Sequence, residues 1–205
     1  MTTFSISASG HATETPLGTP WEVLGPSGVN ANGTVFTGAG TNPSMSGYLN
    51  SVTNFGDDQY CEITWSGTLV AADNVGVGAR GQNGGSGFTG YIASNHAGDG
   101  RTYVLKYVNG TPTTIANPTA TFANPLRVSV TTSGANALIA VTNNGTHITG
   151  SPFTDSTSPI AGGQPTIYYD RDNIGANGIT LVAGGDVGGS VSAKLLSMIN
   201  NQAGF

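Results

Sequence analysis

Acidic side chains come first among the residues that could do chemistry, because two carboxylates held across a glycosidic bond can hydrolyse it. Alternate positions of one strand would hold such a pair on a single face. Glu14, Glu22 and Glu62 each stand alone, and no run with strand character carries two acids. Glu62 shares its expected face with Tyr60 and Thr64, which favours a solvated or interface position over a general acid. The sequence therefore predicts no glycosidase pair.

The sequence also contains no set of residues arranged for nucleophilic catalysis. His11, His96 and His147 fall in loops or at strand ends, and no Gly-x-Ser-x-Gly turn is present. Cys61, the sole cysteine, alternates with apolar residues, which predicts a buried and unreactive thiol. The glycine-rich stretch 81–90 lacks the Gly-Lys-Ser/Thr ending of a phosphate-binding loop and predicts a hairpin loop. We therefore predict no catalytic residues and no enzyme.

One loop is rich in oxygen ligands for a cation. Asp170, Asp172 and Asn173 bring hard oxygen donors together, and Asp57 and Asp58 supply two more at the entry of a strand. Ca²⁺ prefers such donors. The spacing does not match an EF-hand, and Asp and Asn also stabilise turns by bonding their own backbone. Two interpretations stay open, a Ca²⁺ site or simple turn formation, and no other cofactor is predicted.

Carbohydrate binding is indicated where aromatic residues stand next to polar ones, because sugars stack on aromatic faces while amides and carboxylates bond their hydroxyls. Tyr168 and Tyr169 directly precede Asp170 and are the candidates for glycan binding. Adjacent strand residues point to opposite faces, so we expect one of the two tyrosines to be exposed. Trp65 alternates with Ile63, which favours packing in the core.

Many short strands must position these residues. Asn-Gly, which tolerates positive φ at both central positions of a type I′ hairpin turn, occurs 5 times. Alternating runs rich in Val, Ile, Thr and Tyr lie between the turns and predict strands over 59–65, 75–79, 88–93, 102–108, 126–132, 137–142, 166–169 and 178–182. Hairpins are predicted to join 103–108 to 113–115 and 137–142 to 146–148. The pattern predicts an all-β fold, an antiparallel β-sandwich.

The one convincing helix lies at the C-terminus. Between Ser190 and Gln202 apolar residues recur at helical spacing. We expect a sandwich domain over 1–189 and a short helical tail over 190–205. The apolar stripe either packs on its own domain or docks on a neighbouring subunit. The candidates for partner contact are Leu195, Leu196, Ile199 and Phe205.

Composition narrows the partners and the compartment. The 205 residues include 6 Lys and Arg against 11 Asp and Glu, and the formal net charge of −5 has the wrong sign for nucleic-acid binding. No stretch is long and apolar enough to span a membrane, and we expect no signal peptide because the start of the chain lacks a basic and an apolar segment. A single cysteine forms no intrachain disulfide, which agrees with folding in a reducing cytosol.

Seven short segments follow one another along the chain: 15–23 with a Pro-Leu-Gly turn before Trp21, 54–63 with Asp-Gln-Tyr, 75–80, 90–93, 105–110, 126–130 and the hairpin at Asn144-Gly145. Taken in this order, they resemble concanavalin A-like lectin/glucanase (laminin-G-like) domains. The resemblance implies a jelly roll of two curved antiparallel sheets with Trp21 in the core. The polar segment 166–173 and the helical tail depart from the family pattern.

Domains of this kind host many functions. The resemblance, the largely uncharged composition and the added helix favour a non-enzymatic virion structural protein, namely a bacteriophage capsid decoration (cement) protein that binds neighbouring shell subunits. Such a protein would be made in the host cytoplasm, reside in the virion and form a homo-oligomer. The alternative is a lectin-like, carbohydrate-binding adhesion module of a tail or cell surface, with surface glycans as its partners. A third interpretation, a glycan hydrolase or lyase, needs a carboxylate pair that we do not find.

Overall fold

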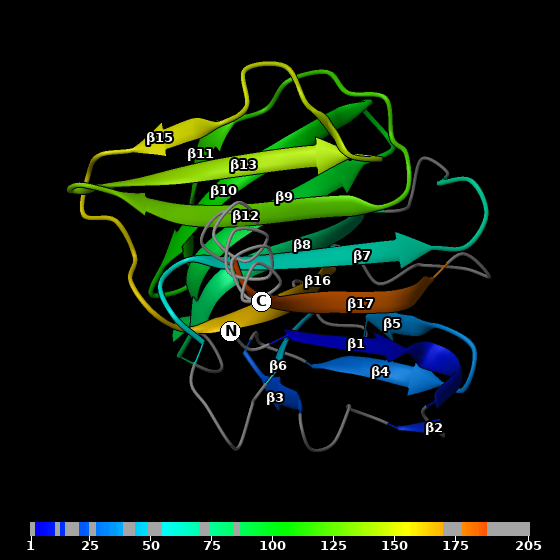
Figure 1. Cartoon of the computed structure of the whole chain (residues 1–205). Coiled ribbons are helices and arrows are strands. Elements are labelled where there is room, and N and C mark those ends of the chain that lie inside the picture. The colour runs from blue at the N-terminus through cyan, green and yellow to red at the C-terminus, as the bar shows by residue number, and fades with distance from the viewer. Residues whose placement is uncertain are drawn as a thin grey trace, which may run out of the picture.

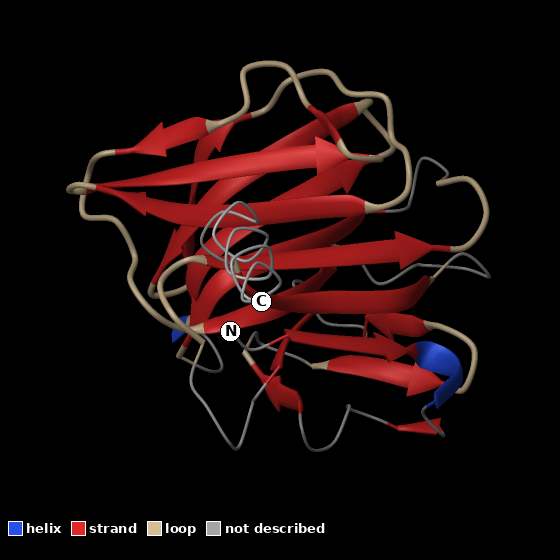
Figure 2. Cartoon of the chain, in the orientation of Figure 1, coloured by secondary structure: helices blue, strands red, loops and turns tan. Residues whose placement is uncertain are grey.

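A computed structural model describes residues 3–10, 13–14, 21–24, 28–38, 44–48, 55–69, 74–83, 87–169 and 178–187. Within these residues nearly all of the regular secondary structure is strand, and Figure 2 shows how little is helical. One helical segment is η1 (Ala8–Gly10), a single turn of 3-10 helix.

Two antiparallel sheets pack face to face as a sandwich (Figure 1). The strands of the larger sheet are β1 (Thr3–Ser7), β2 (Thr13–Glu14), β4 (Val29–Asn32), β5 (Phe36–Gly38), β7 (Gln59–Trp65), β12 (Leu126–Ser133), β13 (Asn136–Asn143), β14 (Thr146–His147), β15 (Phe153–Asp155) and β17 (Ile179–Asp186). Their order is β14-β13-β12-β7-β17-β5-β4-β2, with β1 paired to β17 and β15 paired to β13.

The smaller sheet contains β3 (Trp21–Val23), β6 (Ser44–Tyr48), β8 (Asn74–Gln82), β9 (Thr89–His96), β10 (Arg101–Val108), β11 (Thr111–Ala116) and β16 (Gln164–Tyr169). Its order is β11-β10-β9-β8-β16-β6-β3. In both sheets strands that are distant in the sequence lie side by side, as β16 does beside β8 and β17 beside β7. The predicted antiparallel β-sandwich is therefore confirmed.

The predicted strands are all present, and β7 has the predicted bounds. The other bounds differ by a few residues at one or both ends. The strands before residue 55 were not predicted, because they are only two to five residues long and each gives little sequence signal. β1 is the most consequential of these, since it pairs with β17 over five residue pairs beside the centre of the larger sheet.

The core lies between the sheets, where alternate residues of β7, β12 and β13 are buried. Cys61, Ile63 and Trp65 of β7 point into it, and the residues between them stay half-exposed, as the alternation predicts. Trp21 is also a core residue, with 5% of its surface exposed, in agreement with the resemblance.

Asn-Gly turns close the two predicted hairpins. Asn109 and Gly110 have φ of 49° and 77° between β10 and β11, and Asn144 and Gly145 have φ of 49° and 74° between β13 and β14. Both residues of each pair lie in the left-handed region, as a type I′ turn requires. The sequence therefore determines the position of these two hairpins directly.

A second apolar cluster lies on the other face of the smaller sheet. Its buried members are Leu24, Phe88, Ile92, Leu105, Tyr107 and Tyr168, with Tyr103 partly buried against them. Tyr103, Leu105 and Tyr107, at alternate positions of β10, thus share this face of the sheet. A Cβ at Gly78 would lie 2.5 Å from Ile92 Cδ1 and 2.7 Å from the Tyr91 carbonyl oxygen, so a side chain there would collide with this cluster.

The predicted C-terminal helix and the boundary at residue 189 lie outside the described residues. Among the described residues no helix has the length and hydropathy needed to cross a membrane.

Candidate functional site

A hollow of about 390 Å³ opens at the end of the sandwich that contains the turn between β13 and β14. We call it the polar hollow, because most of its lining residues carry a hydroxyl, an amide or an imidazole. The described lining residues are Thr119, Ala120, Thr121, Ala123, Asn143, Asn144, Thr146, His147, Ile148 and Thr149.

One wall is the β13–β14 hairpin and the turn after it. The tight turn folds β14 back so that Thr142 pairs with His147 and Asn143 with Thr146. The turn is tied to the neighbouring wall because the Asn144 amide donates to the Pro125 carbonyl, 2.8 Å away. Thr146 and His147 are therefore held over the hollow by backbone hydrogen bonds.

The other wall is the segment 117–125, which connects β11 to β12. The Thr102 amide donates to the Pro118 carbonyl at 3.0 Å, and the Ala120 amide donates to the Gly100 carbonyl at 3.1 Å. Arg101 Nη1 also donates to the Asn117 carbonyl at 2.7 Å. The segment is thus fixed on the start of β10 although it is not itself a strand.

Asn143 is the most informative lining residue. A chain of hydrogen bonds leads to it from the core: Thr102 Oγ1 donates to Asn95 Oδ1 at 2.7 Å, and Asn95 Nδ2 donates to Asn143 Oδ1 at 3.3 Å. This chain leaves Asn143 Nδ2 as a donor. The nitrogen is buried and has no hydrogen-bond partner among the described residues, and only 7% of the residue is exposed. A buried donor without an acceptor costs about 1–3 kcal/mol, so a ligand oxygen that accepted from it would recover much of that cost.

His147 is held at the rim by a second set of bonds. Its Nδ1 lies 2.9 Å from Ser151 Oγ, which accepts a hydrogen bond from the Val141 amide at 2.9 Å. Because that oxygen already accepts, its own proton is free to be donated to His147 Nδ1. The imidazole is thereby oriented beside the threonine hydroxyls.

A smaller hollow of about 270 Å³ adjoins the polar hollow, and we call it the aromatic hollow. Its described lining residues are Trp65, Gly67, Thr68, Leu69, Phe122, Ala123 and Asn124. Ala123 lines both hollows, so the segment 119–124 is the partition between them. Asn124 fixes this partition to β7, because its Oδ1 accepts from the Trp65 amide at 3.0 Å and its Nδ2 donates to the Trp65 carbonyl at 2.8 Å.

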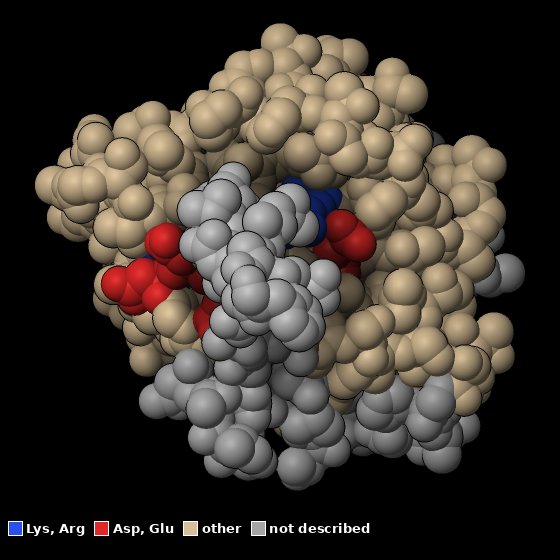
Figure 3. Space-filling view, in the orientation of Figure 1, with Lys and Arg blue, Asp and Glu red and all other residues tan. Residues whose placement is uncertain are grey.

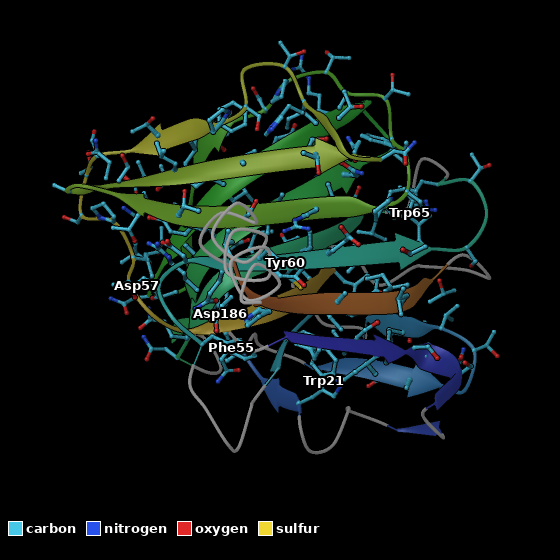
Figure 4. The ribbon with its side chains drawn as sticks, viewed as in Figure 1. Trp21, Phe55, Asp57, Tyr60, Trp65 and Asp186 are labelled. Carbon is cyan, nitrogen blue, oxygen red and sulfur yellow. The ribbon has the colours of Figure 1, made fainter. Side chains whose placement is uncertain are left out.

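Acidic residues gather at the opposite end of β7. Figure 4 labels Trp65 at one end of this strand and Asp57, Asp186 and Phe55 at the other. In Figure 3 the acidic surface lies to the left and in the centre of this face, whereas the described surface toward the Trp65 end is uncharged. The two hollows are therefore separated from Asp57 and Asp186 by the length of β7.

The carboxylates at that acidic end are used within the fold. Asp57 Oδ1 accepts from the Gly162 amide at 2.7 Å, Asp58 Oδ1 accepts from the Thr132 amide at 2.7 Å, and Asp186 Oδ1 accepts from the Gly56 amide at 2.8 Å. Among the described residues no group of three or more His, Cys, Asp or Glu is arranged to hold a metal ion. Asp57 and Asp58 thus act as anchors for backbone amides here.

Arg80 is a buried residue that links several segments at the acidic end of β7. It is 2% exposed, and its guanidinium donates to the carbonyls of Asp57 and Ile160 and to Thr132 Oγ1. Burial lowers the pKa of this guanidinium, and the nearby Tyr91 and aspartates act against that effect. Arg80 therefore fastens the loop around Ile160 to the sandwich.

The two predicted glycan-binding tyrosines are both buried, which contradicts the expectation that one is exposed. Tyr169 points into the core, where its hydroxyl donates to the Phe36 carbonyl, and burial raises its pKa. Tyr168 points to the opposite face, as adjacent strand residues must, but it packs in the second apolar cluster with its hydroxyl 3.2 Å from that of Tyr107. Neither ring offers a free face to a sugar.

The predicted buried thiol is confirmed. Cys61 has no exposed surface, and burial raises its pKa to about 12. The remaining candidates lie outside the described residues, both the Ca²⁺ ligands Asp170, Asp172 and Asn173 and the partner-contact residues Leu195, Leu196, Ile199 and Phe205.

Comparison with known proteins bears on the fold. No family model and no curated protein matches the sequence. Among solved structures, carbohydrate-binding module CBM66 from Bacillus subtilis aligns with a TM-score of 0.52 and 16% identity over 82% of this chain and 96% of that one. A legume lectin-like domain from Entamoeba histolytica aligns with a TM-score of 0.52 and 12% identity over 86% and 97%. The exoplasmic/lumenal domain of VIP36, in its Ca²⁺/Man2-bound form, aligns with a TM-score of 0.50 and 12% identity over 93% and 91%.

These similarities extend over most of both chains and all concern one architecture. The chain has the concanavalin A-like jelly-roll fold that its sequence segments resemble. The predicted virion role, capsid partners and self-association stay predictions, because neither the described residues nor these similarities bear on them.

Proposed function

We propose that this protein is a non-catalytic carbohydrate-binding module that holds a neutral glycan in the polar hollow. Asn143 carries the proposal, because its buried Nδ2 donor lies beside a hollow rimmed with hydroxyls and has no acceptor among the described residues. A sugar hydroxyl or ring oxygen supplies that acceptor, and the threonines around it exchange further hydrogen bonds with neighbouring hydroxyls. A carbohydrate-binding module is the alternative function that the sequence leaves open.

The lining chemistry supports a neutral ligand. None of the described lining residues is Asp, Glu, Lys or Arg, so no fixed charge among them selects an anionic or cationic sugar. The same lining supports binding without catalysis, because glycoside hydrolysis requires two carboxyl groups flanking the bond. The names of two similar structures, a carbohydrate-binding module and a lectin-like domain, point to the same class of function.

A glycan array tests the proposal when the wild type is compared with a Thr121→Val, Thr149→Val double variant. Both threonines are exposed and line the polar hollow, so the exchange removes two hydroxyls while retaining their shape. Each lost hydrogen bond costs about 0.5–1.5 kcal/mol, so affinity for the glycans that bind should fall about fivefold or more. Thr113→Val, on the exposed strand β11, is the matched control and should bind like the wild type.

Two results would contradict the proposal. One is an array on which no neutral glycan binds the wild type. The other is a bound glycan whose dissociation constant, measured by calorimetry, is the same for the double variant and for the Thr113→Val control.

A further inference from the structure

The Asn-Gly turns of this chain bring a reactive pair of groups together. The structure describes both residues of three such turns, Asn32-Gly33, Asn109-Gly110 and Asn144-Gly145, and a threonine follows each of them. The backbone nitrogen of a glycine can attack the side chain of the preceding asparagine, because glycine has no Cβ to hinder the approach. Since the three tripeptides are identical, the fold is the main difference between them.

The reaction is a cyclisation followed by a hydrolysis. The glycine nitrogen forms a bond to Cγ of the asparagine, ammonia leaves, and a cyclic imide results. Water then opens the imide at either carbonyl and leaves aspartate, or isoaspartate in which the main chain runs through the former side chain. Nothing is oxidised or reduced, and water is the only co-reactant. The fold can therefore hinder the reaction by holding either the asparagine side chain or the glycine amide.

Two of the three turns are held at one of the reacting groups. Asn32 Oδ1 accepts hydrogen bonds from the Thr34 and Val35 amides, both at 2.9 Å, which fixes the asparagine side chain. The Gly110 amide donates to the Phe88 carbonyl at 2.7 Å, which engages the attacking nitrogen. These hydrogen bonds must break before either turn can cyclise.

The turn at Asn144-Gly145 has neither restraint. Among the described residues no hydrogen bond holds the Asn144 side chain or the Gly145 amide, and both residues are exposed. The Asn144 amide donates to the Pro125 carbonyl, but cyclisation rotates the bond from Cα to the carbonyl carbon, which lies beyond that nitrogen. The rotation displaces β14, which pairs with β13 over two residues at the end of the sheet, whereas β11 pairs with β10 over five. A short terminal pairing opens more readily than a long one.

We infer that Asn144 is a modification site, at which the folded protein converts asparagine to isoaspartate and aspartate faster than at the other two described turns. Asn144 lines the polar hollow, whose described lining contains no Asp, Glu, Lys or Arg, so both products add the first carboxylate there. Isoaspartate also lengthens the main chain by one atom. The two-residue turn between the paired Asn143 and Thr146 must then change its geometry. The inference does not depend on the proposed function.

Peptide mapping of the full chain, aged at mildly alkaline pH, tests the inference. Trypsin cuts after Arg80, Lys106 and Arg127, so the three turns fall in different peptides. Fragmentation mass spectrometry gives the modified fraction at each asparagine, and an isoaspartate-specific methyltransferase identifies the isoaspartate. The chain in concentrated denaturant is the reference, because only the sequence acts there. Folding should raise the ratio of the Asn144 rate to the Asn109 rate about fivefold or more, since only the second turn must first release a bonded glycine amide.

Asn144→Asp is the matched control for the change in the turn, because it adds the carboxylate without lengthening the main chain. Anion exchange isolates the aged fraction by its added charge, and ¹⁵N–¹H spectra compare it with the variant. The isoaspartate fraction should lose the native backbone signals of Asn143 and Thr146, whereas Asn144→Asp should retain them close to their native positions. The inference is overturned if folding leaves the ratio of the two rates unchanged, if Asn144 is not modified, or if the isoaspartate fraction keeps the native signals.

Discussion

Single residues in this sandwich bury polar groups away from water, and Asn143 is one whose hydrogen bonds are incomplete among the described residues. Asn95, Thr102 and Asn143 are all buried, and they satisfy one another in sequence until the chain ends at Asn143 Nδ2. Arg80, equally buried, has its guanidinium bonded to two carbonyls and a hydroxyl. Most buried polar groups in proteins are hydrogen-bonded, so the exception at the polar hollow indicates a ligand position.

Cys61 provides a residue-scale prediction. Because burial raises the pKa of its thiol to about 12, the reactive thiolate is scarce at mildly alkaline pH, and the sulfur is also inaccessible. We expect no reaction of the folded protein with a thiol-specific disulfide reagent, followed by one equivalent of reaction on addition of denaturant. Stoichiometric labelling of the folded protein at the rate of a free thiol would contradict this account.

Gly163 provides a second prediction at the scale of a single residue. Its φ is +106°, and a Cβ there would lie 2.5 Å from the Arg80 carbonyl carbon and 2.7 Å from the Arg80 and Gly81 carbonyl oxygens, which are rigid backbone atoms. Gly134 also has positive φ, +59°, but a Cβ there meets nothing within 4 Å. Urea unfolding should show that Gly134→Ala costs about 1–2 kcal/mol for the left-handed backbone, and that Gly163→Ala costs at least about 3 kcal/mol. Equal losses for the two variants would show that the close approach to Arg80 contributes nothing.

At the scale of elements, a polar cluster joins the edge strand β15 to the smaller sheet. Lys106 Nζ of β10 lies 2.7 Å from Asp155 Oδ2 of β15, and the Tyr91 hydroxyl of β9 donates to the same oxygen at 2.7 Å. The Tyr91 hydroxyl accepts in turn from the Ile160 amide at 3.0 Å. Strands of both sheets and the following loop are thereby held together at one point.

This cluster makes stability depend on pH. Burial by itself would raise the pKa of Asp155, but the hydrogen bonds from Lys106, Tyr91 and the Thr157 amide outweigh it, and the pKa lies below its usual range. A depressed pKa in the folded state means that the stabilisation is present above the unfolded value, about 3.9, and is lost as pH falls through the folded value. At neutral pH Asp155→Asn should cost about 1.5–3 kcal/mol, because it removes the carboxylate that pairs with Lys106, although Lys106 Nζ keeps its hydrogen bonds to the Thr157 and Ser158 carbonyls.

Urea midpoints measured from neutral to acidic pH check this prediction. The difference between the wild type and Asp155→Asn should shrink as pH falls below about 4, where the wild-type carboxylate takes up its proton. Asp99→Asn is the control, since exposed Asp99 also accepts a tyrosine hydroxyl bond, from Tyr103 at 2.7 Å, but should cost much less. A constant difference at all pH values would contradict the role of the Asp155 charge.

Alternation and turn chemistry predict the strands from residue 59 onward, because these signals are local. The alternation in β7 predicts its buried face, and Asn144-Gly145 predicts the hairpin that forms one wall of the polar hollow. The site itself could not be predicted, because its threonines are ordinary surface residues in the sequence and are brought to Asn143 only by the pairing of distant segments. The burial of Tyr168 was missed for the same reason, since Phe88, Leu105 and Tyr107 come to it from other strands.

For the whole molecule, the jelly roll separates one cluster of aspartates from the candidate binding end. Asp57, Asp58 and Asp186 lie at the start of β7 and the end of β17, whereas both hollows lie at the opposite end of β7 (Figure 4). A formal net charge of −5 repels anionic ligands in general, and the described lining of the hollows adds no cation to attract them. The described lining of the polar hollow is thus uncharged and hydroxyl-rich, which suits neutral sugars, and the charged Arg101 pairs with Thr119 at its edge.

The side-chain amide signal of Asn143 in a ¹⁵N–¹H correlation spectrum tests the central claim most directly. The signal can be assigned by its absence in Asn143→Asp, which retains an oxygen for Asn95 Nδ2 and removes the free donor. On titration with a neutral glycan that binds, we predict a saturable shift of this signal together with backbone signals of Thr121, Thr146 and Thr149. Saturable shifts confined to another part of the molecule, with the Asn143 amide unmoved, would contradict the account.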